Sequence, residues 1–162
     1  NSTARTVQRT PPGELEAVMA ANVTGPFVLA QAAIPPMLER GGGTIITVAS
    51  YAALFANPMA GAAYSASKAA VLNLTRMLNV ELRNRGIRSC AIIPGEANTP
   101  ILAQRALVPD AQARATMMRP EDVAAAIVFC ASLPPRATVE ELIIRPTYLR
   151  DFRKDIEAAL TR

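Results

Sequence analysis

A tyrosine and a lysine one helical turn apart are the residues of this sequence best suited to acid–base chemistry. Tyr64 and Lys68 lie four positions apart in a segment, 58–85, that predicts a helix, so their side chains face the same way. A lysine ammonium beside a phenol favours the phenolate, which makes Tyr64 a candidate general acid and base. Ser50 ends a short β-branched segment and can hold a substrate carbonyl together with the Tyr64 hydroxyl.

Residue types exclude several other kinds of site. The sequence contains no histidine, which removes Ser-His-Asp catalysis, His-paired cysteine nucleophiles and His-ligated zinc, and we predict no metal site. Cys90 and Cys130 each lie in an apolar run. They are expected to be buried, reduced thiols of a cytoplasmic protein.

Composition indicates one ordinary globular domain, 1–162, in which 51% of residues are hydrophobic and 19% are charged. The net charge is +4, but the basic residues are interleaved with acids and aromatic residues make up only 4%, so no nucleic-acid partner is expected. The longest apolar run, 123–133, is too short to cross a bilayer. The N-terminus does not resemble a signal peptide, and no membrane partner is expected.

Helical and strand patterns alternate along the chain. They predict helix 13–40, strand 44–48, helix 58–85, strand 87–94, a helix opening at 120 and strand 140–145. Continuous apolar strands alternating with helices imply an α/β fold with a doubly wound parallel sheet, in which ligands bind at the carboxyl ends of the strands.

Several local features refine this pattern. Gly25-Pro26 and Pro35-Pro36 predict breaks or kinks in the first helix, and Asn57 is expected to cap the second one ahead of Pro58. Residues 97–118 are expected to be irregular or weakly helical. Residues 148–162 are expected to form a charged tail.

Four motifs together resemble the short-chain dehydrogenase/reductase family, over about residues 14–147. They are the strand-ending Ser50 followed by Tyr64-Ser65-Ala66-Ser67-Lys68, the segment Asn22-Val23-Thr24-Gly25, the segment Pro94-Gly95-Glu96-Ala97-Asn98-Thr99, and the helix start Pro120-Glu121-Asp122. The resemblance implies a partial Rossmann-like sheet and an oxidoreductase that interconverts secondary alcohols and carbonyls by hydride transfer.

The resemblance also implies a catalytic role for each matching residue. Tyr64 exchanges the proton with the substrate oxygen, Lys68 assists Tyr64, and Ser50 orients the oxygen. Asn22 positions a water in a proton relay to Lys68. Because Pro26 has no N–H, the Asn22 carbonyl lacks a helical partner, and we expect it to bind an ordered water.

The cofactor implied by the resemblance is NAD or NADP, and the substrate is a small alcohol or carbonyl compound. Pro94, Gly95 and Thr99 are expected to flank the nicotinamide, where Tyr64 and Lys68 also contact the cofactor. The resemblance further implies a homo-oligomer that associates through helices 14–40 and 58–85.

The sequence departs from the family at its beginning. It contains no G-x-x-x-G-x-G turn for the pyrophosphate and starts with Asn1 rather than methionine, so we expect a piece of a longer protein whose first strand–helix–strand units are missing. The alternative function is a fragment or interaction module with no catalytic activity of its own, because the glycine-rich cofactor-binding segment is absent. Its partial sheet would expose an edge that pairs with another chain or aggregates.

Three expectations concern loops near the site. Residues 99–118 are expected to be a mobile substrate lid. Glu96 is expected to be a solvated loop acid. The arginines of 145–153 could bind an acidic substrate, but surface charge is the default interpretation.

Overall fold

Three parallel strands form one sheet in the computed structural model, which describes residues 4–162. The strands are β1 (Gly43–Val48), β2 (Ile87–Pro94) and β3 (Glu141–Ile144), in the order β1-β2-β3. All three match expected strands, and their parallel pairing confirms the α/β class and the partial Rossmann-like sheet.

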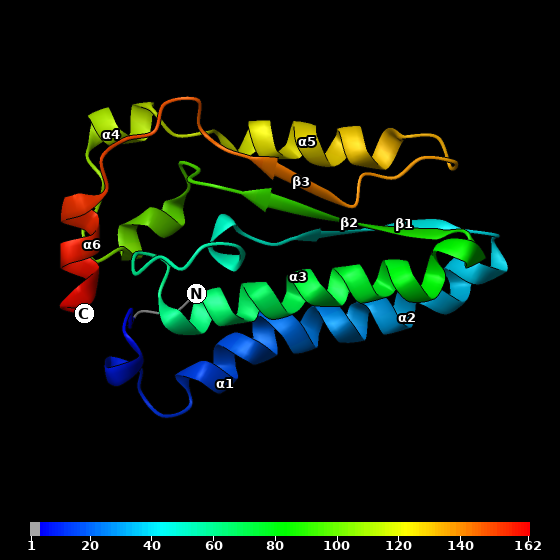
Figure 1. Cartoon of the computed structure of the whole chain (residues 1–162), viewed down its shortest axis with the longest axis horizontal. Coiled ribbons are helices and arrows are strands. Elements are labelled where there is room, and N and C mark those ends of the chain that lie inside the picture. The colour runs from blue at the N-terminus through cyan, green and yellow to red at the C-terminus, as the bar shows by residue number, and fades with distance from the viewer. Residues whose placement is uncertain (1–3) are drawn as a thin grey trace.

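The carboxyl ends of the strands meet at one edge of the sheet. Val48 lies opposite Ile92, and Pro94 lies opposite Ile144. In Figure 1, β2 and β3 point toward the end of the molecule where α4 (Ala111–Ala115) and α6 (Arg153–Leu160) lie. Loops that leave the three strands therefore share this end.

The central strand is buried on both faces because helices cover the sheet from both sides. The helices α2 (Gly25–Glu39) and α3 (Ala62–Leu82) lie on one side and α5 (Pro120–Ser132) on the other (Figure 1). Alternate residues of a strand point to opposite faces. Ala91 and Ile93 accordingly pack with Leu72 of α3, whereas Cys90 and Ile92 pack with Cys130 of α5.

The two cysteines are buried and free. Burial, with a smaller contribution from the neighbouring Cys130, raises the pKa of the Cys90 thiol to about 12. The thiolate is the reactive form of cysteine. The two thiols therefore serve as packing residues between β2 and α5 rather than as nucleophiles.

The N-terminal run stays helical past its prolines, so a break at Pro35-Pro36 is wrong. Directly before Gly25-Pro26, however, a π-helical turn interrupts the regular α-helix. The run consists of α1 (Glu14–Met19), a π-helical turn at Ala20–Thr24, and α2. Pro26 lies in the first turn of α2, where a missing N–H is tolerated. Pro35 and Pro36 lie inside α2, whose neighbouring apolar residues pack on the core formed by α3 and β2; tertiary packing outweighs local propensity there.

The same run, Glu14–Glu39, is 26 residues long, and the mean hydropathy of its most apolar 18-residue window is 1.5, which by length and composition alone is sufficient to cross a membrane. Only 11% of its most apolar window is buried within this chain. Counting uninterrupted apolar residues misses it because polar residues are spaced along the run. An apolar, largely uncovered helix needs a covering surface.

Helix α3 starts four residues later than expected. Asn57 caps a turn instead, accepting the Met59 N–H at 2.9 Å through its side-chain oxygen. The end of the helix is as predicted, because Gly86 adopts a left-handed conformation with φ 84° after the 3-10 turn Arg83–Arg85.

Segments expected to be irregular contain further structure. Residues 97–118 hold a 3-10 helix, Pro100–Gln104, and the short α4, with Leu102 and Met117 buried. Residues 148–162, expected to be a charged tail, include α6, in which Asp155 and Ala159 are buried. The short helices within 97–118 agree with the expectation of an irregular or weakly helical segment. Local patterns missed α6, because long-range contacts stabilise it.

Candidate active site

A cavity of about 650 Å³ lies at the carboxyl ends of the three strands. Its walls include all seven residues expected to act in catalysis or cofactor binding, namely Asn22, Ser50, Tyr64, Lys68, Pro94, Gly95 and Thr99. These residues come from four separate regions of the chain. The fold therefore brings the expected groups together in one place.

Tyr64 and Lys68 occupy the first turns of α3, beside the end of β1. The Lys68 Nζ lies 5.7 Å from the centre of the Tyr64 ring and donates a hydrogen bond of 2.8 Å to the carbonyl oxygen of Val48. Burial lowers the pKa of Lys68. No carboxylate within residues 4–162 forms an ion pair with this ammonium, so its charge can act on the phenol.

Ser50 follows β1 at the point where the chain turns into the 3-10 helix Tyr51–Ala53. The strand continues to Ala49, whose N–H donates to the carbonyl of Ile92 at 2.8 Å. The Ser50 Oγ accepts the N–H of Ala52 at 3.2 Å. This contact orients the hydroxyl and leaves its proton available for a ligand.

Asn22 lies in the π-helical turn and is joined to α3 through a buried serine. The side-chain amide of Asn22 donates to the Ser67 Oγ at 2.9 Å, and Ser67 donates to the Tyr64 carbonyl at 2.8 Å. Within the turn, the Gly25 N–H bonds to the Ala20 carbonyl. Single π turns inside α-helices often mark functional sites. The link through Ser67 was not anticipated, although Ser67 lies inside the Tyr64–Lys68 motif.

The end of β2 contributes the residues expected near the nicotinamide. The Gly95 N–H donates to the Ile144 carbonyl at 2.8 Å, which extends the pairing of β2 with β3. A side chain at Gly95 would meet Arg145, since a Cβ there would lie 3.2 Å from the Arg145 Cγ. Thr99 precedes the 3-10 helix that begins at Pro100 and makes no side-chain capping bond.

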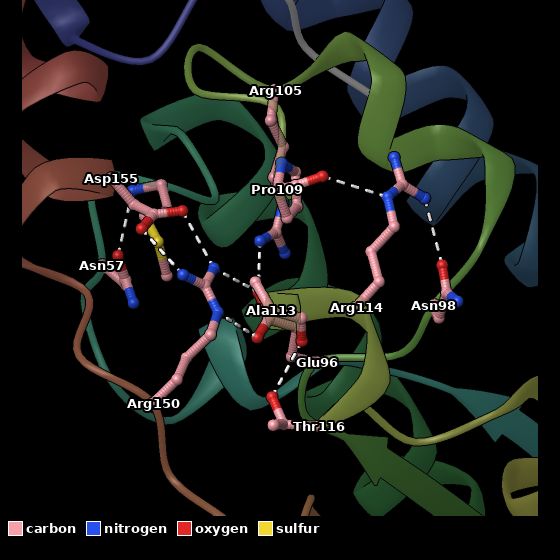
Figure 2. A network of polar contacts seen from close by, with 11 residues as sticks. Asn57, Glu96, Asn98, Arg105, Pro109, Ala113, Arg114, Thr116, Arg150 and Asp155 are labelled. Atoms are coloured by element: carbon pink, nitrogen blue, oxygen red, sulfur yellow. Dashed lines mark hydrogen bonds and ion pairs between the residues drawn. The ribbon is translucent and has the colours of Figure 1, made fainter. Parts of the chain in front are cut away.

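Glu96 is not a solvated loop acid, contrary to expectation. Its side chain is 9% exposed and pairs with Arg105 and Arg150, as Figure 2 shows. Arg150 donates to both Glu96 oxygens at 2.8 Å and also to both oxygens of Asp155, at 2.8 and 2.9 Å. The network joins the end of β2 to helix α6.

The ion pairs of this network also shift the pKa values of Glu96 and Arg150. Burial alone would raise the pKa of Glu96, but hydrogen bonds from Arg150 and Arg105 hold it below its ordinary value. The hydrogen bonds to Glu96 and Asp155 raise the pKa of Arg150. Arg150 is thus not surface charge, and sequence reasoning missed it because Glu96, the partner that draws it into the site, lies 54 positions away along the chain.

A second arginine of the same region lies in the cavity wall. Arg145 donates to the Tyr51 hydroxyl at 3.0 Å, and its guanidinium carbon lies 4.0 Å from the centre of the Tyr51 ring. The Tyr51 ring in turn lies 4.9 Å from that of Phe55. All three side chains line the cavity.

This fold and site define a Rossmann-like α/β protein with a Ser–Tyr–Lys cluster at the strand ends. The family model described as short chain dehydrogenase matches residues 2–108. The chain belongs to the short-chain dehydrogenase family.

Two curated relatives from Xanthobacter autotrophicus are similar to the chain. One is 2-(S)-hydroxypropyl-CoM dehydrogenase 3, 39% identical over 126 residues, which cover 71% of this chain and 49% of that protein. The other is 2-(R)-hydroxypropyl-CoM dehydrogenase, 42% identical over 105 residues, which cover 65% of this chain and 42% of that protein. The chain thus spans about half the length of these relatives.

A similar solved structure is a gluconate 5-dehydrogenase from Burkholderia cenocepacia, determined in complex with NADP and tartrate. It is 28% identical to this chain, with a TM-score of 0.77 over 88% of this chain and 59% of that one. The likeness supports the partial Rossmann-like fold.

Proposed function

We propose that the protein interconverts a secondary alcohol and a carbonyl compound by hydride transfer with NAD or NADP. One observation carries the proposal. The side chains of Asn22, Ser50, Tyr64 and Lys68 line a single cavity at the carboxyl ends of the strands, where open α/β sheets bind ligands. Membership of the short-chain dehydrogenase family and the dehydrogenase names of the relatives support the same class of reaction.

Each residue has a distinct part in the proposed reaction. The hydroxyls of Ser50 and Tyr64 hold the substrate oxygen, and Tyr64 gives its proton in reduction and takes it back in oxidation. Lys68, held by the Val48 carbonyl, places a positive charge beside the phenol. Asn22 ties the π-helical turn to α3 and is the proposed site of a relay water.

The residues present fit the nicotinamide end of the cofactor. Pro94, Gly95 and Thr99 line the same cavity as Tyr64 and Lys68, and the Lys68 ammonium can donate to ribose hydroxyls. The bound nicotinamide would supply or accept the hydride. The sequence has no glycine-rich turn of the kind that binds the pyrophosphate.

The alternative is that the chain has no catalytic activity of its own and serves as an interaction module. It is favoured by the open edge of the sheet, because within residues 4–162 strand β1 pairs only with β2. An unpaired strand edge is a site for pairing with another chain.

Titrating the chain with NADH and with NADPH, followed by nicotinamide fluorescence, separates the two functions. Saturable binding at micromolar concentrations, accompanied by oxidation of the cofactor with a ketone, is expected of the enzyme. Absence of binding to both cofactors would support the alternative.

We also propose that the protein is a homo-oligomer that associates through the helices 14–40 and 58–85. Large apolar side chains are exposed on both helices, namely Phe27, Val28 and Leu29 on α2 and Met77 and Val80 on α3. Burying such a surface against a second copy removes apolar area from water.

A further inference from the structure

We propose that the substrate carries a carboxylate and that Arg145 binds it. The inference rests on the proposed function and adds the class of substrate. A guanidinium presents parallel N–H donors that match the two oxygens of a carboxylate. The residues that place this group in the cavity are Tyr51, Gly95 and Arg145 itself.

Arg145 directly follows the last residue of β3, so it stands at the same sheet edge as Ser50 and Gly95. The Tyr51 ring and hydroxyl hold its guanidinium on one side. Its aliphatic stem lies so close to Gly95 that a Cβ there would meet the Arg145 Cγ at 3.2 Å. The side chain is therefore supported on two sides while remaining open to solvent.

The positive charge of Arg145 is not compensated by any carboxylate in the described part of the chain. The charged residues of the cavity wall are Arg5, Lys68, Arg105 and Arg145 against Glu96. Glu96 is bound by Arg105 and Arg150. No carboxylate within residues 4–162 pairs with Arg145. A cavity with an excess of one charge attracts ligands of the opposite sign.

The other basic side chains of the wall are already engaged. Arg5 is only 4% exposed and donates to the carbonyls of Ala60 and Gln104 at 3.2 and 3.1 Å. Lys68 donates to the Val48 carbonyl, and its remaining N–H groups are assigned to the cofactor ribose in the proposed function; Arg105 pairs with Glu96. Within residues 4–162, Arg145 donates only to the Tyr51 hydroxyl, so its remaining N–H groups are available for an anion.

Tyr51 links this group to the catalytic residues. Tyr51 directly follows Ser50 in the chain, so the Cα atoms of these two residues are about 3.8 Å apart. The arginine held by Tyr51 and the Ser50 hydroxyl that orients the substrate oxygen therefore belong to the wall of the same cavity. A short oxo or hydroxy acid, with the reacting carbon a few bonds from the carboxylate, fits this arrangement.

The test compares two ligands with the same five-carbon skeleton, 4-oxopentanoate and 2-pentanone, which differ by a carboxylate in place of a methyl group. Dissociation constants are measured by NMR titration for the unaltered chain and for Arg145→Gln, Arg145→Lys and Arg136→Gln. Arg136 is an exposed arginine that does not line the cavity, so it controls for loss of net charge.

We expect the unaltered chain to bind 4-oxopentanoate about tenfold more tightly than 2-pentanone, as a charged hydrogen bond would give. Arg145→Gln should abolish this preference, Arg145→Lys should keep part of it, and Arg136→Gln should keep all of it. Equal binding of the two ligands by the unaltered chain, or an equal loss in Arg136→Gln, would overturn the proposal.

Oxidation of NADH and NADPH with both ligands is recorded separately. A preference for 4-oxopentanoate that depends on Arg145, without any cofactor oxidation, supports the carboxylate site and contradicts the proposed function. Equal turnover of both ligands, unchanged in Arg145→Gln, supports the proposed function and contradicts the carboxylate site.

Discussion

The Lys68 ammonium is partly buried beside Tyr64, a position that serves the proposed catalysis but disfavours the charged form of the lysine. Burial lowers the pKa of Lys68, which means that the folded chain disfavours the charged form relative to water. Its hydrogen bond to Val48 fixes the ammonium beside the tyrosine. Stability and activity should therefore respond in opposite ways to its removal.

We predict that Lys68→Met lowers the rate of cofactor oxidation by about a hundredfold or more, while the melting temperature stays equal or rises. The only other lysine, Lys154, is exposed on α6, and Lys154→Met is the matched control with unchanged rate. Steady-state rates and thermal unfolding by circular dichroism check both variants. A large drop in the melting temperature of Lys68→Met would point to a structural role instead.

Glu96 should make stability depend on pH in the acid range. Its folded pKa lies below the ordinary value, and the unfolded value is about 4.3. A carboxylate whose pKa is lower in the folded than in the unfolded state stabilises the fold. This stabilisation is complete at pH values above the unfolded-state pKa and is lost as the pH falls through the folded-state pKa. We predict that between pH 5 and pH 3 the unfolding free energy falls more steeply in the unaltered chain than in Glu96→Gln.

Urea unfolding at pH 7, 5, 4 and 3 measures this difference. The comparison uses the slope of the free energy against pH, because Glu96→Gln also leaves Arg105 and Arg150 without their shared partner at every pH. Parallel slopes in the two proteins would show that Glu96 does not contribute to the pH dependence.

At the scale of elements, helix α6 depends on Arg150 for its attachment to β2. Arg150 is the group that bonds both Glu96 and Asp155 (Figure 2). We predict that Arg150→Met lowers the unfolding free energy by about 3–5 kcal/mol, because the buried Asp155 loses its ion-pair partner and the buried Glu96 keeps only Arg105. Arg153→Met is the matched control, since the pair of Arg153 with Asp151 is exposed and solvent screening leaves such pairs little effect on stability.

Urea unfolding of the two variants under identical conditions decides the question. Losses of equal size would mean that the network around Arg150 does not hold the helix, and that α6 is retained by its apolar contacts alone.

Sequence patterns predicted elements where local residue types decide the structure. The β-branched segment 44–48 and the apolar segment 87–94 form strands as expected, and Gly86 ends its helix. The patterns were wrong where distant contacts decide. Pro35 stays helical because the turns around it are packed on the core.

At the scale of the whole molecule, the catalytic residues could be predicted from the sequence, but the other residues that line the cavity could not. Ser50, Tyr64 and Lys68 could be connected because strand and helix ends meet at one sheet edge. The partnership of Tyr51 with Arg145 spans 94 positions, and no local spacing indicates it. Contacts of this kind depend on how the strands are ordered, which a single sequence does not state.

The uncovered apolar face of α2 and α3 leads to a prediction about assembly. Leu29 on α2 is 71% exposed and Val80 on α3 is 73% exposed, and the run Glu14–Glu39 is mostly uncovered. We predict that the protein is a dimer or larger at micromolar concentration. Leu29→Lys and Val80→Lys should each shift it toward monomer, because a buried lysine without a partner opposes association.

Size-exclusion chromatography with light scattering measures the mass of each variant. Val108→Lys is the control, because Val108 is 51% exposed but lies in the segment before α4 rather than on these helices. A monomeric unaltered chain, or equal dissociation by the control, would contradict the proposed interface. Co-sedimentation of the unaltered chain with neutral lipid vesicles, lost in Leu29→Lys, would instead assign the apolar run to a membrane surface.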